Sequence, residues 1–211
     1  INVIPTKIIN AFLSAEDKDF YKHFGLDLQA TLRAVIVNLK NYGTKKRLVG
    51  ASTITQQVAK NFLLTSEVSF ERKIKEAILA IRIERAFSKD EILELYLNEI
   101  YLGNNSYGVA AAALNYFDKS LDDLNFPEAA FLAGLPKAPS KYNPKTNYTK
   151  TVNRRNWVLK QMKKNKFIND EQYNKFQKVA LVTKSSSGLD DTSAPYFSEE
   201  VRRSLLKKFG P

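Results

Sequence analysis

The sequence predicts a mainly α-helical protein. Apolar residues recur at helical spacing through most of its 211 residues, and no run alternates apolar and polar residues for long enough to indicate a strand. Hydrophobic residues make up 44% of the chain and charged residues 26%, which is typical of a globular protein with one well-buried core. No apolar run approaches the roughly 18 residues that a membrane-spanning helix requires.

Charge and cysteine content narrow the classes of function. The formal net charge of +11 predicts an anionic partner, which could be nucleic acid, acidic lipid or a phosphorylated substrate. The chain has no cysteine, which excludes disulfides, a thiolate nucleophile and a cysteine-based metal site. With a single histidine as well, the composition argues against a zinc site.

The first predicted helix carries candidate chemistry at its end. Its apolar positions follow Pro5, which suits a first turn, and they are Ile8, Ile9, Phe12 and Leu13. Glu16 should lie near the end of this helix, which Gly25 would stop. The negative end of the helix dipole disfavours a charged carboxylate there, so partial burial would raise the pKa of Glu16 and make it a candidate general base. The alternative is that Glu16 and Asp17 form a solvated face and that His23 is structural.

A second helix and a basic loop come next. Asp27 can cap a helix that ends near Gly43. Its apolar positions are Leu28, Leu32, Val35, Ile36 and Leu39. We expect residues 41–52, which include the basic run 45–47, to form a mobile loop. This loop is either a solvated turn or a flap beside an anionic substrate or membrane.

The third helix presents an unusual group of polar residues. Ser52 or Thr53 can cap it. Its polar positions are Gln56, Gln57, Lys60 and Asn61. Two neighbouring glutamines just before an apolar core segment are uncommon.

The fourth helix begins with two cations. Ser69 can cap it, and we expect a buried stripe of Ile74, Ile78 and Ile81. Arg72 and Lys73 lie in its first turn, where the dipole disfavours cations unless an anion binds nearby. Glu76 lies one turn beyond Arg72 and could orient it, although a surface ion pair is the commoner case.

The rest of the chain is helical up to a Ser-rich stretch. Ser88 and Glu91 form a capping box, so Glu91 is explained as a cap before any other role. In the helix that follows, the inward positions should be Ile92, Leu95, Tyr96 and Ile100. Further helices are predicted at residues 107–117, 127–136, 149–164 and 169–179. Because residues 184–192 are linker-like, we divide the chain into a domain at 1–183 and a linker with the start of a following segment at 184–211.

Taken together, five stretches of the chain resemble one known family. They are AEDKDFYKHFG, GASTITQQVAKN, RKIKEAILAIRIE, KDEILELYLNEIYLG with the following YGVAAAAL, and EAAFLAGLPKAPSKYNP. In this order they are similar to the motifs of the peptidoglycan glycosyltransferases, which include the polymerase domain of class A penicillin-binding proteins. The end of the chain resembles the segment that leads to the transpeptidase domain of those proteins.

This resemblance implies a lysozyme-like helical fold in two lobes and an enzyme on the outer, periplasmic face of the bacterial inner membrane. It implies polymerisation of lipid II into glycan strands by an inverting transfer that releases undecaprenyl pyrophosphate. The implied partners are lipid II, the growing strand, the membrane surface and a transpeptidase domain, and not nucleic acid. We also expect a membrane anchor, which this sequence does not include, and sensitivity to moenomycin.

The resemblance also implies roles for individual residues. Glu16 matches the family's active-site glutamate and would be the general base. Three cations, Lys60, Arg72 and Lys73, would stabilise the pyrophosphate and are called the cationic clamp below. Glu76 would be a second catalytic residue that holds this clamp or a divalent cation. Further matches to substrate-binding motifs are Asp17, His23, Ser52, Thr53, Gln56, Gln57, Asn61 and Glu91. No tightly bound cofactor is implied, but Mg²⁺ or Mn²⁺ could share the pyrophosphate.

Two positions depart from the family pattern. Ala51 stands where a second glycine is usual, and Val68 stands where many relatives carry an arginine that helps to bind pyrophosphate. The second departure shifts more of that task to the cationic clamp. The loop at 41–52 would face lipid, together with apolar positions around Phe12, Phe24 and Leu39.

Two other functions stay open from the sequence. A lysozyme-like glycan-cleaving enzyme also pairs carboxylates on a helical fold, but it must protonate a sugar leaving group, whereas pyrophosphate leaves without an acid. The cation-rich segment 72–76 favours the pyrophosphate. The net charge would also suit a helical nucleic-acid-binding protein, although the chain has no recognisable recognition helix.

Overall fold

The computed structural model describes residues 3–44, 50–63 and 69–184. These residues form nine α-helices and one short 3₁₀ helix, and within them the only β-type pairing is an isolated bridge between Tyr101 and Tyr107. The helices are α1 (Thr6–Glu16), η1 (Phe20–Lys22), α2 (Leu28–Lys40), α3 (Ile54–Leu63), α4 (Phe70–Ala86), α5 (Lys89–Glu99), α6 (Val109–Phe117), α7 (Phe126–Gly134), α8 (Tyr148–Lys164) and α9 (Asp170–Phe176). The predicted mainly α-helical class is therefore confirmed.

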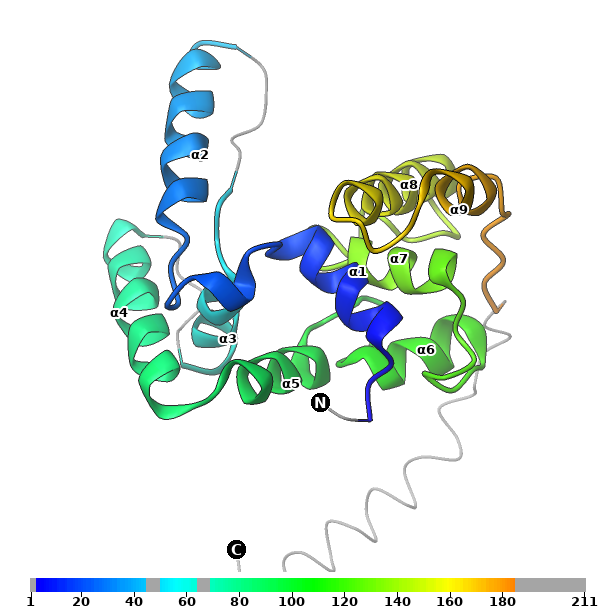
Figure 1. Cartoon of the computed structure of the whole chain (residues 1–211), viewed down its shortest axis with the longest axis horizontal. Helices are drawn as coiled ribbons and strands as arrows, with labels where there is room; N and C mark the ends of the chain where they lie inside the picture. Colours follow the sequence, from blue (N-terminus) through cyan, green and yellow to red (C-terminus); the bar gives the residue numbers. More distant parts are fainter. Residues whose placement is uncertain (1–2, 45–49, 64–68, 185–211) are drawn as a thin grey trace, which may run out of the picture.

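The helices form two groups that meet at α1 (Figure 1). On one side α7 and α8 pack against each other and against α1, with α9 on α8. On the other side α3 packs against α4 and α5, and α5 joins the groups through its contact with α6. Helix α2 projects away from both groups (Figure 1). The end of α1 thus lies where the two groups come together.

One hydrophobic core runs through both groups. Phe12 of α1 and Tyr96 of α5 meet edge to face, with ring centroids 6.2 Å apart, although they come from opposite sides. Helix α7 is buried along most of its length, as its predicted apolar sequence requires. Burying a large apolar side chain stabilises a fold by roughly 1.5–3 kcal/mol, so this shared core holds the two groups together.

The predicted N-terminal caps are confirmed. The Asp27 carboxylate accepts from the backbone N–H of Ala30, and the Ser69 hydroxyl accepts from that of Arg72. Ser88 and Glu91 make both hydrogen bonds of a capping box. For α3, where two caps were open, Thr53 takes the position: its hydroxyl accepts from the backbone N–H of Gln56.

Two expectations about local structure are wrong, the stop at Gly25 and the exposure of Phe12. Helix α1 ends at Glu16, well before Gly25, because the chain turns there into the 3₁₀ helix η1. Gly25 instead adopts a φ of +82° where the chain passes the α4 backbone, and a Cβ atom there would lie 3.0 Å from the carbonyl oxygen of Ala80. Phe12 cannot face lipid, because it is fully buried in the core.

The buried face of α4 is also not the one predicted. Ile74 and Ile78 are each 47% exposed, and Ile81 is only half-buried. The positions that α4 turns inward are Glu76, Ala80 and Ile83. Burying a carboxylate on this face is possible because two cations of the same helix pair with it, as described below.

In α5 one predicted inward residue lies at the surface. Leu95 is 36% exposed, whereas Leu93 and Leu97 are fully buried. The other predicted positions, Ile92, Tyr96 and Ile100, are buried as expected.

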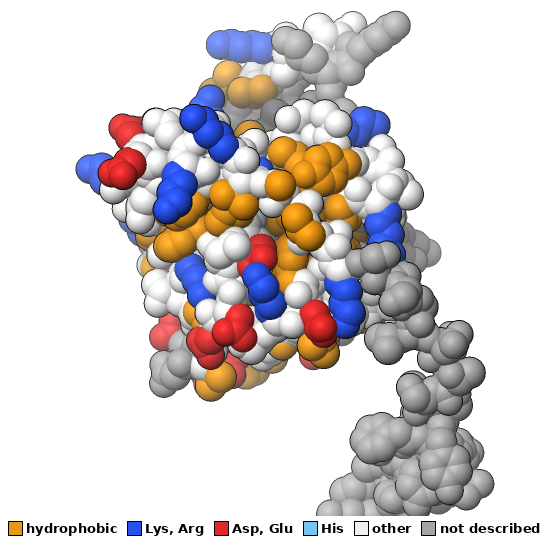
Figure 2. Space-filling view, turned by 90° about the vertical axis from the view of Figure 1, so that its right-hand side faces the viewer, with side chains coloured by type: hydrophobic (Ala, Val, Ile, Leu, Met, Phe, Trp, Pro, Cys, Tyr) orange, Lys and Arg blue, Asp and Glu red, His pale blue; other side chains and the backbone are white. Residues whose placement is uncertain are grey.

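The surface mixes apolar and basic side chains. Figure 2 shows the side on which α8 and α9 lie, where Lys and Arg side chains are spread over the face with hydrophobic side chains exposed between them. Helix α2 is the most apolar exposed element, with Leu28 at 75%, Leu32 at 62% and Leu39 at 68% exposure. Among the described helices, none is both long enough and apolar enough to cross a bilayer.

Candidate active site

Glu16 lies at the junction of three helices. It is the last residue of α1, and its side chain is only 13% exposed. The side-chain amide of Gln57, on α3, donates a 2.9 Å hydrogen bond to Glu16 Oε2. From α8, Arg154 Nη2 lies 3.7 Å from Glu16 Oε1. A single carboxylate therefore receives one neutral donor and one cation from the two helix groups.

The pKa of Glu16 is raised above its usual value. Burial is the largest cause, because desolvation disfavours the charged form. The hydrogen bond from Gln57 and the charges of Arg154 and Lys137 act in the opposite direction and only partly offset burial. The predicted direction is thus confirmed, with burial as the dominant cause. A raised pKa suits a carboxylate that takes up a proton during a reaction.

Tyr96 orients the amide that reaches Glu16. Its hydroxyl lies 3.5 Å from Gln57 Oε1, at the long end of hydrogen-bond distance. Burial raises the pKa of Tyr96 well above its usual value, so the hydroxyl keeps its proton and can donate. With its oxygen accepting from Tyr96, the Gln57 amide turns its NH₂ group toward Glu16.

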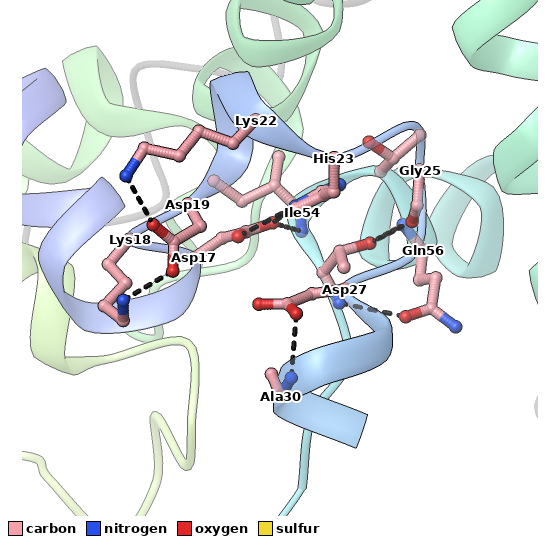
Figure 3. Close-up of polar contacts among 12 residues, drawn as sticks. Asp17, Lys18, Asp19, Lys22, His23, Gly25, Asp27, Ala30, Ile54 and Gln56 are labelled. Carbon is pink, nitrogen blue, oxygen red and sulfur yellow. Dashed lines mark hydrogen bonds and ion pairs between the residues drawn. The ribbon is translucent and has the colours of Figure 1, made fainter. Parts of the chain in front are cut away.

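Asp17 joins the end of α1 to the start of α3. Its buried carboxylate lies 3.0 Å from His23 Nε2 and accepts a 3.0 Å hydrogen bond from the backbone N–H of Ile54 (Figure 3). Ile54 is the first residue of α3, so Asp17 satisfies a backbone donor that the helix itself leaves unpaired. Asp17 and His23 therefore fix the helix that carries Gln57.

Thr53 and Gln56 complete this anchor. The Thr53 hydroxyl donates a 2.6 Å hydrogen bond to the carbonyl oxygen of Gly25, and Gln56 Oε1 accepts from the backbone N–H of Thr53 (Figure 3). Both side chains are used within the protein, so in this structure they position α3.

Two members of the cationic clamp converge on Glu76. Its side chain is 1% exposed and pairs with Arg72 Nε at 3.2 Å and with Lys73 Nζ. The predicted contact between Glu76 and Arg72 is therefore present. Two cations in the first turn of α4 oppose the helix dipole, and the buried carboxylate offsets their charge. Glu76 holds Arg72 and Lys73 in one place.

Lys60 and Asn61 lie on a hollow that adjoins Gln57. This hollow has a volume of about 430 Å³, and both side chains are exposed. Opposite them are two tyrosines, Tyr101 and Tyr107, whose ring centroids are 4.9 Å apart. The hollow offers a cation and apolar ring faces. Gln57, which lines it, is the residue that donates to Glu16.

Ser52 lines a second, smaller hollow of about 140 Å³, together with Glu16 and Asp17. Glu91 lies apart from these features: it is exposed and lines neither hollow. Hydrogen bonds from the backbone and hydroxyl of Ser88 lower the pKa of Glu91. In the structure Glu91 acts as a helix cap.

The described residues near the clamp form no ready-made cluster of metal ligands. Within the described ranges, no three acidic or histidine side chains come together as ligands. Glu76 already faces two cations, which would repel a third. Val68, which departs from the family pattern, lies outside the described residues. Residues 45–49 of the basic loop do so as well.

Sequence reasoning missed Arg154. This residue is 8% exposed, and its Nε donates to the carbonyl oxygen of Gly134 at 3.0 Å. Gly134 leaves room for it, because a Cβ atom there would lie 3.1 Å from Arg154 Cγ. The available signal was its position: Arg154 shares the apolar face of α8 with Thr151 and Val158, where a charge needs a partner.

Comparisons with known proteins agree with these motifs. A family model described as Transglycosylase matches residues 1–163. Penicillin-binding protein 1A of Rickettsia bellii is 47% identical over 210 residues, which is 100% of this chain and 26% of that protein. The protein of the same name from Aquifex aeolicus is 48% identical over 210 residues, covering 100% of this chain and 28% of that protein. A crystal structure of penicillin-binding protein 1A from Haemophilus influenzae is 38% identical, with a TM-score of 0.47, over 75% of this chain and 20% of that one. The chain thus spans about a quarter of the length of the curated relatives it matches.

Proposed function

Because the chain belongs to the transglycosylase family, we propose that it polymerises lipid II into the glycan strands of peptidoglycan and releases undecaprenyl pyrophosphate. The observation that carries this proposal is the buried Glu16, which has a raised pKa and lies between the amide of Gln57 and the guanidinium of Arg154. In the whole protein we propose that a transpeptidase domain follows this one.

Glu16 acts as the general base in the proposed reaction. The 4-hydroxyl of the acceptor sugar attacks the anomeric carbon of the donor, and Glu16 removes the hydroxyl proton. The bond from the anomeric carbon to the pyrophosphate oxygen breaks, and the pyrophosphate leaves with the electron pair. A positioned base contributes typically 10²–10⁴-fold to such a step.

The cationic clamp stabilises the leaving pyrophosphate. Lys60 presents its charge from the hollow beside Gln57, while Glu76 holds Arg72 and Lys73 together on α4. Negative charge grows on the pyrophosphate as the bond breaks, and fixed cations stabilise that charge without rearranging. No step is assigned to a metal ion.

The environment of Asp17 favours transfer over hydrolysis. A lysozyme-like mechanism uses two carboxylates, one on each side of the scissile bond. Asp17 is buried and already engaged by His23 and by the backbone N–H of Ile54, so it does not serve as the second carboxylate. A single available carboxylate, Glu16, together with the cationic clamp fits a reaction in which the leaving group needs no proton.

The test is incubation with labelled lipid II in detergent, followed by gel separation of the products. The parent protein should form long glycan strands, and Glu16→Gln should lower the rate by about 100-fold or more. Asp19→Asn is the matched control, because Asp19 is near in sequence and, among the residues that the structure describes, its ion pairs are with Lys18 and Lys22. Near-normal polymerisation by Glu16→Gln would remove Glu16 from the mechanism, and release of short cleaved fragments from preformed strands would favour the hydrolase.

We also propose that α2 lies against the membrane surface that holds the lipid substrate. Its exposed leucines would be costly in water in a free domain, and Phe24, just before α2, is 54% exposed as well. Basic residues near an anionic surface each contribute roughly 1 kcal/mol to membrane binding. The net charge of +11 fits such a surface.

A further inference from the structure

A third hollow next to the reaction centre is lined by cations. It has a volume of about 410 Å³ and lies between the loop after α7 and the first half of α8. Its lining residues are Lys137, Lys141, Tyr142, Lys150, Asn153, Arg154 and Trp157. Every charged side chain in this set is positive, so the hollow is suited to an anion.

The three lysines of this hollow form no close ion pair in the described part of the chain, although the charge of Lys137 acts on Glu16. By contrast Lys119, just before α7, pairs with Glu128 of that helix. Lys150 also lies in the first turn of α8, where the helix dipole disfavours a cation. Like charges around a small hollow repel one another, and a bound anion offsets that repulsion.

Aromatic rings give the hollow an apolar wall. The Arg154 guanidinium lies over the Trp157 ring at 4.2 Å and near the Tyr142 ring at 5.9 Å. Trp157 remains 41% exposed. An exposed ring beside cations can pack against the apolar face of a ligand while the cations bind its charged groups.

Arg154 connects this hollow to the proposed base. The same side chain that lines the hollow lies 3.7 Å from the carboxylate of Glu16. A ligand bound here would therefore contact the same arginine that lies beside the proposed base. A charged group carried by the substrate can thus occupy this hollow while the sugar reaches Glu16.

We propose that this hollow binds the carboxylates of the peptide that the substrate's muramic acid carries, so that the enzyme reads the peptide as well as the sugar. This inference rests on the proposed function. Pyrophosphate is the other anion of the substrate, but it is compact and is served by the cationic clamp on α3 and α4. Lysines spaced around a rim from two segments of chain fit a longer ligand with several separate carboxylates.

Trp157 makes the test direct, because it is the only tryptophan in the chain. Its fluorescence should change in a saturable way when the protein is titrated with a soluble disaccharide tetrapeptide. The double variant Lys141→Ala/Lys150→Ala should bind about tenfold more weakly, which is about 1.4 kcal/mol over two charges. Added salt should weaken binding by the parent, because exposed charges are screened.

A matched control removes two lysines of the same helix that lie outside the hollow. Lys160→Ala/Lys164→Ala loses the same charge from exposed positions of α8 and should bind the peptide-bearing disaccharide as the parent does. The disaccharide without peptide, and inorganic pyrophosphate, are the ligand controls. Equal affinity for the disaccharide with and without peptide would overturn the inference, as would tight binding of pyrophosphate at Trp157 or an equal loss in both double variants.

The polymerisation assay on the same preparation keeps the two proposals apart. Polymer formation without peptide-dependent binding would overturn this inference and leave the proposed function standing. Peptide-dependent binding without polymer formation would support the hollow and count against the proposed function.

Discussion

The side chains of Glu16 and Gln57 share a 2.9 Å hydrogen bond although 41 positions separate them in the sequence. The amide donates, so it favours the charged form of a carboxylate whose burial favours the neutral form. The pKa of Glu16 is therefore set by two opposing effects: burial at the end of α1 raises it, and the hydrogen bond from Gln57 of α3 lowers it.

Replacing Gln57 should change the pH dependence of the reaction. A base works when deprotonated, so the raised pKa of Glu16 predicts an acid limb of kcat/KM above pH 4.5, the usual value. Gln57→Leu removes a hydrogen bond that lowers this pKa, so the limb should move to still higher pH. The measurement is a pH–rate profile, with Gln161→Leu on α8 as the control. An unchanged limb in Gln57→Leu would show that the hydrogen bond does not set the pKa.

Asp17→Ala should destabilise the protein. It leaves the backbone N–H of Ile54 without its acceptor and removes the partner of His23. A buried donor without a partner costs about 1–3 kcal/mol in the free energy of unfolding. Chemical denaturation measures this, with Asp19→Ala as a more exposed control. A loss no larger than that of the control would contradict the anchoring role of Asp17.

Glu76→Gln should lower both stability and rate. The amide keeps the shape but leaves Arg72 and Lys73 without their shared negative charge, and removing one partner of a buried charge pair is destabilising. If the pair positions the clamp, kcat should also fall in steady-state kinetics, under conditions where the variant is fully folded by circular dichroism. A stability loss with unchanged kcat would assign Glu76 a structural role only.

Gly108→Ala should destabilise the protein more than Gly43→Ala. Both glycines have a φ near +78°, at +78° and +77°. At Gly43 an added Cβ meets nothing within 4 Å, so only the strain of roughly 1–2 kcal/mol applies. At Gly108 ψ is 159°, a combination with positive φ that almost only glycine adopts, and the Cβ would also clash with the backbone of Asn98, so the loss in unfolding free energy should be clearly larger. Equal losses in thermal or chemical denaturation would show that the turn before α6 relaxes.

Polar substitution on α2 should weaken membrane binding. Leu32→Gln with Leu39→Gln removes apolar area from the exposed face of α2 and should reduce flotation with liposomes that contain anionic lipid. Leu114→Gln, at a 57% exposed position of α6, is the control. Binding that survives the α2 double variant would show that α2 does not carry the contact.

Features that depend on a few neighbouring residues were predictable from the sequence. Asp27, Ser69 and the Ser88–Glu91 box cap their helices as expected, because a cap needs only the backbone three residues ahead. The buried face of α4 was not predictable in this way. Apolar periodicity favoured Ile74 and Ile78, but the neighbouring helices α3 and α5 select the face that carries Glu76 and Ala80.

The candidate site shows the same contrast between features that the sequence displays and features that only the packing of helices creates. Glu16 and Gln57 stand in motifs that the sequence displays, and the structure brings them into contact. Arg154 was not predicted because its partner Glu16 lies on α1, far away in the sequence. In a chain with a net charge of +11, one more basic residue is also not distinctive. Its place on the apolar face of α8 becomes meaningful only once α1 and α7 are packed against that face.

The last turn of α1 is tied to both helix groups. On one side Asp17 holds the start of α3, and on the other the hydroxyl of Ser14 accepts a 3.1 Å hydrogen bond from Asn165 at the end of α8. A hinge motion between the groups would have to stretch one of these links, and Glu16 stands between them. Any relative motion of the two helix groups would therefore be transmitted to the carboxylate of Glu16 itself.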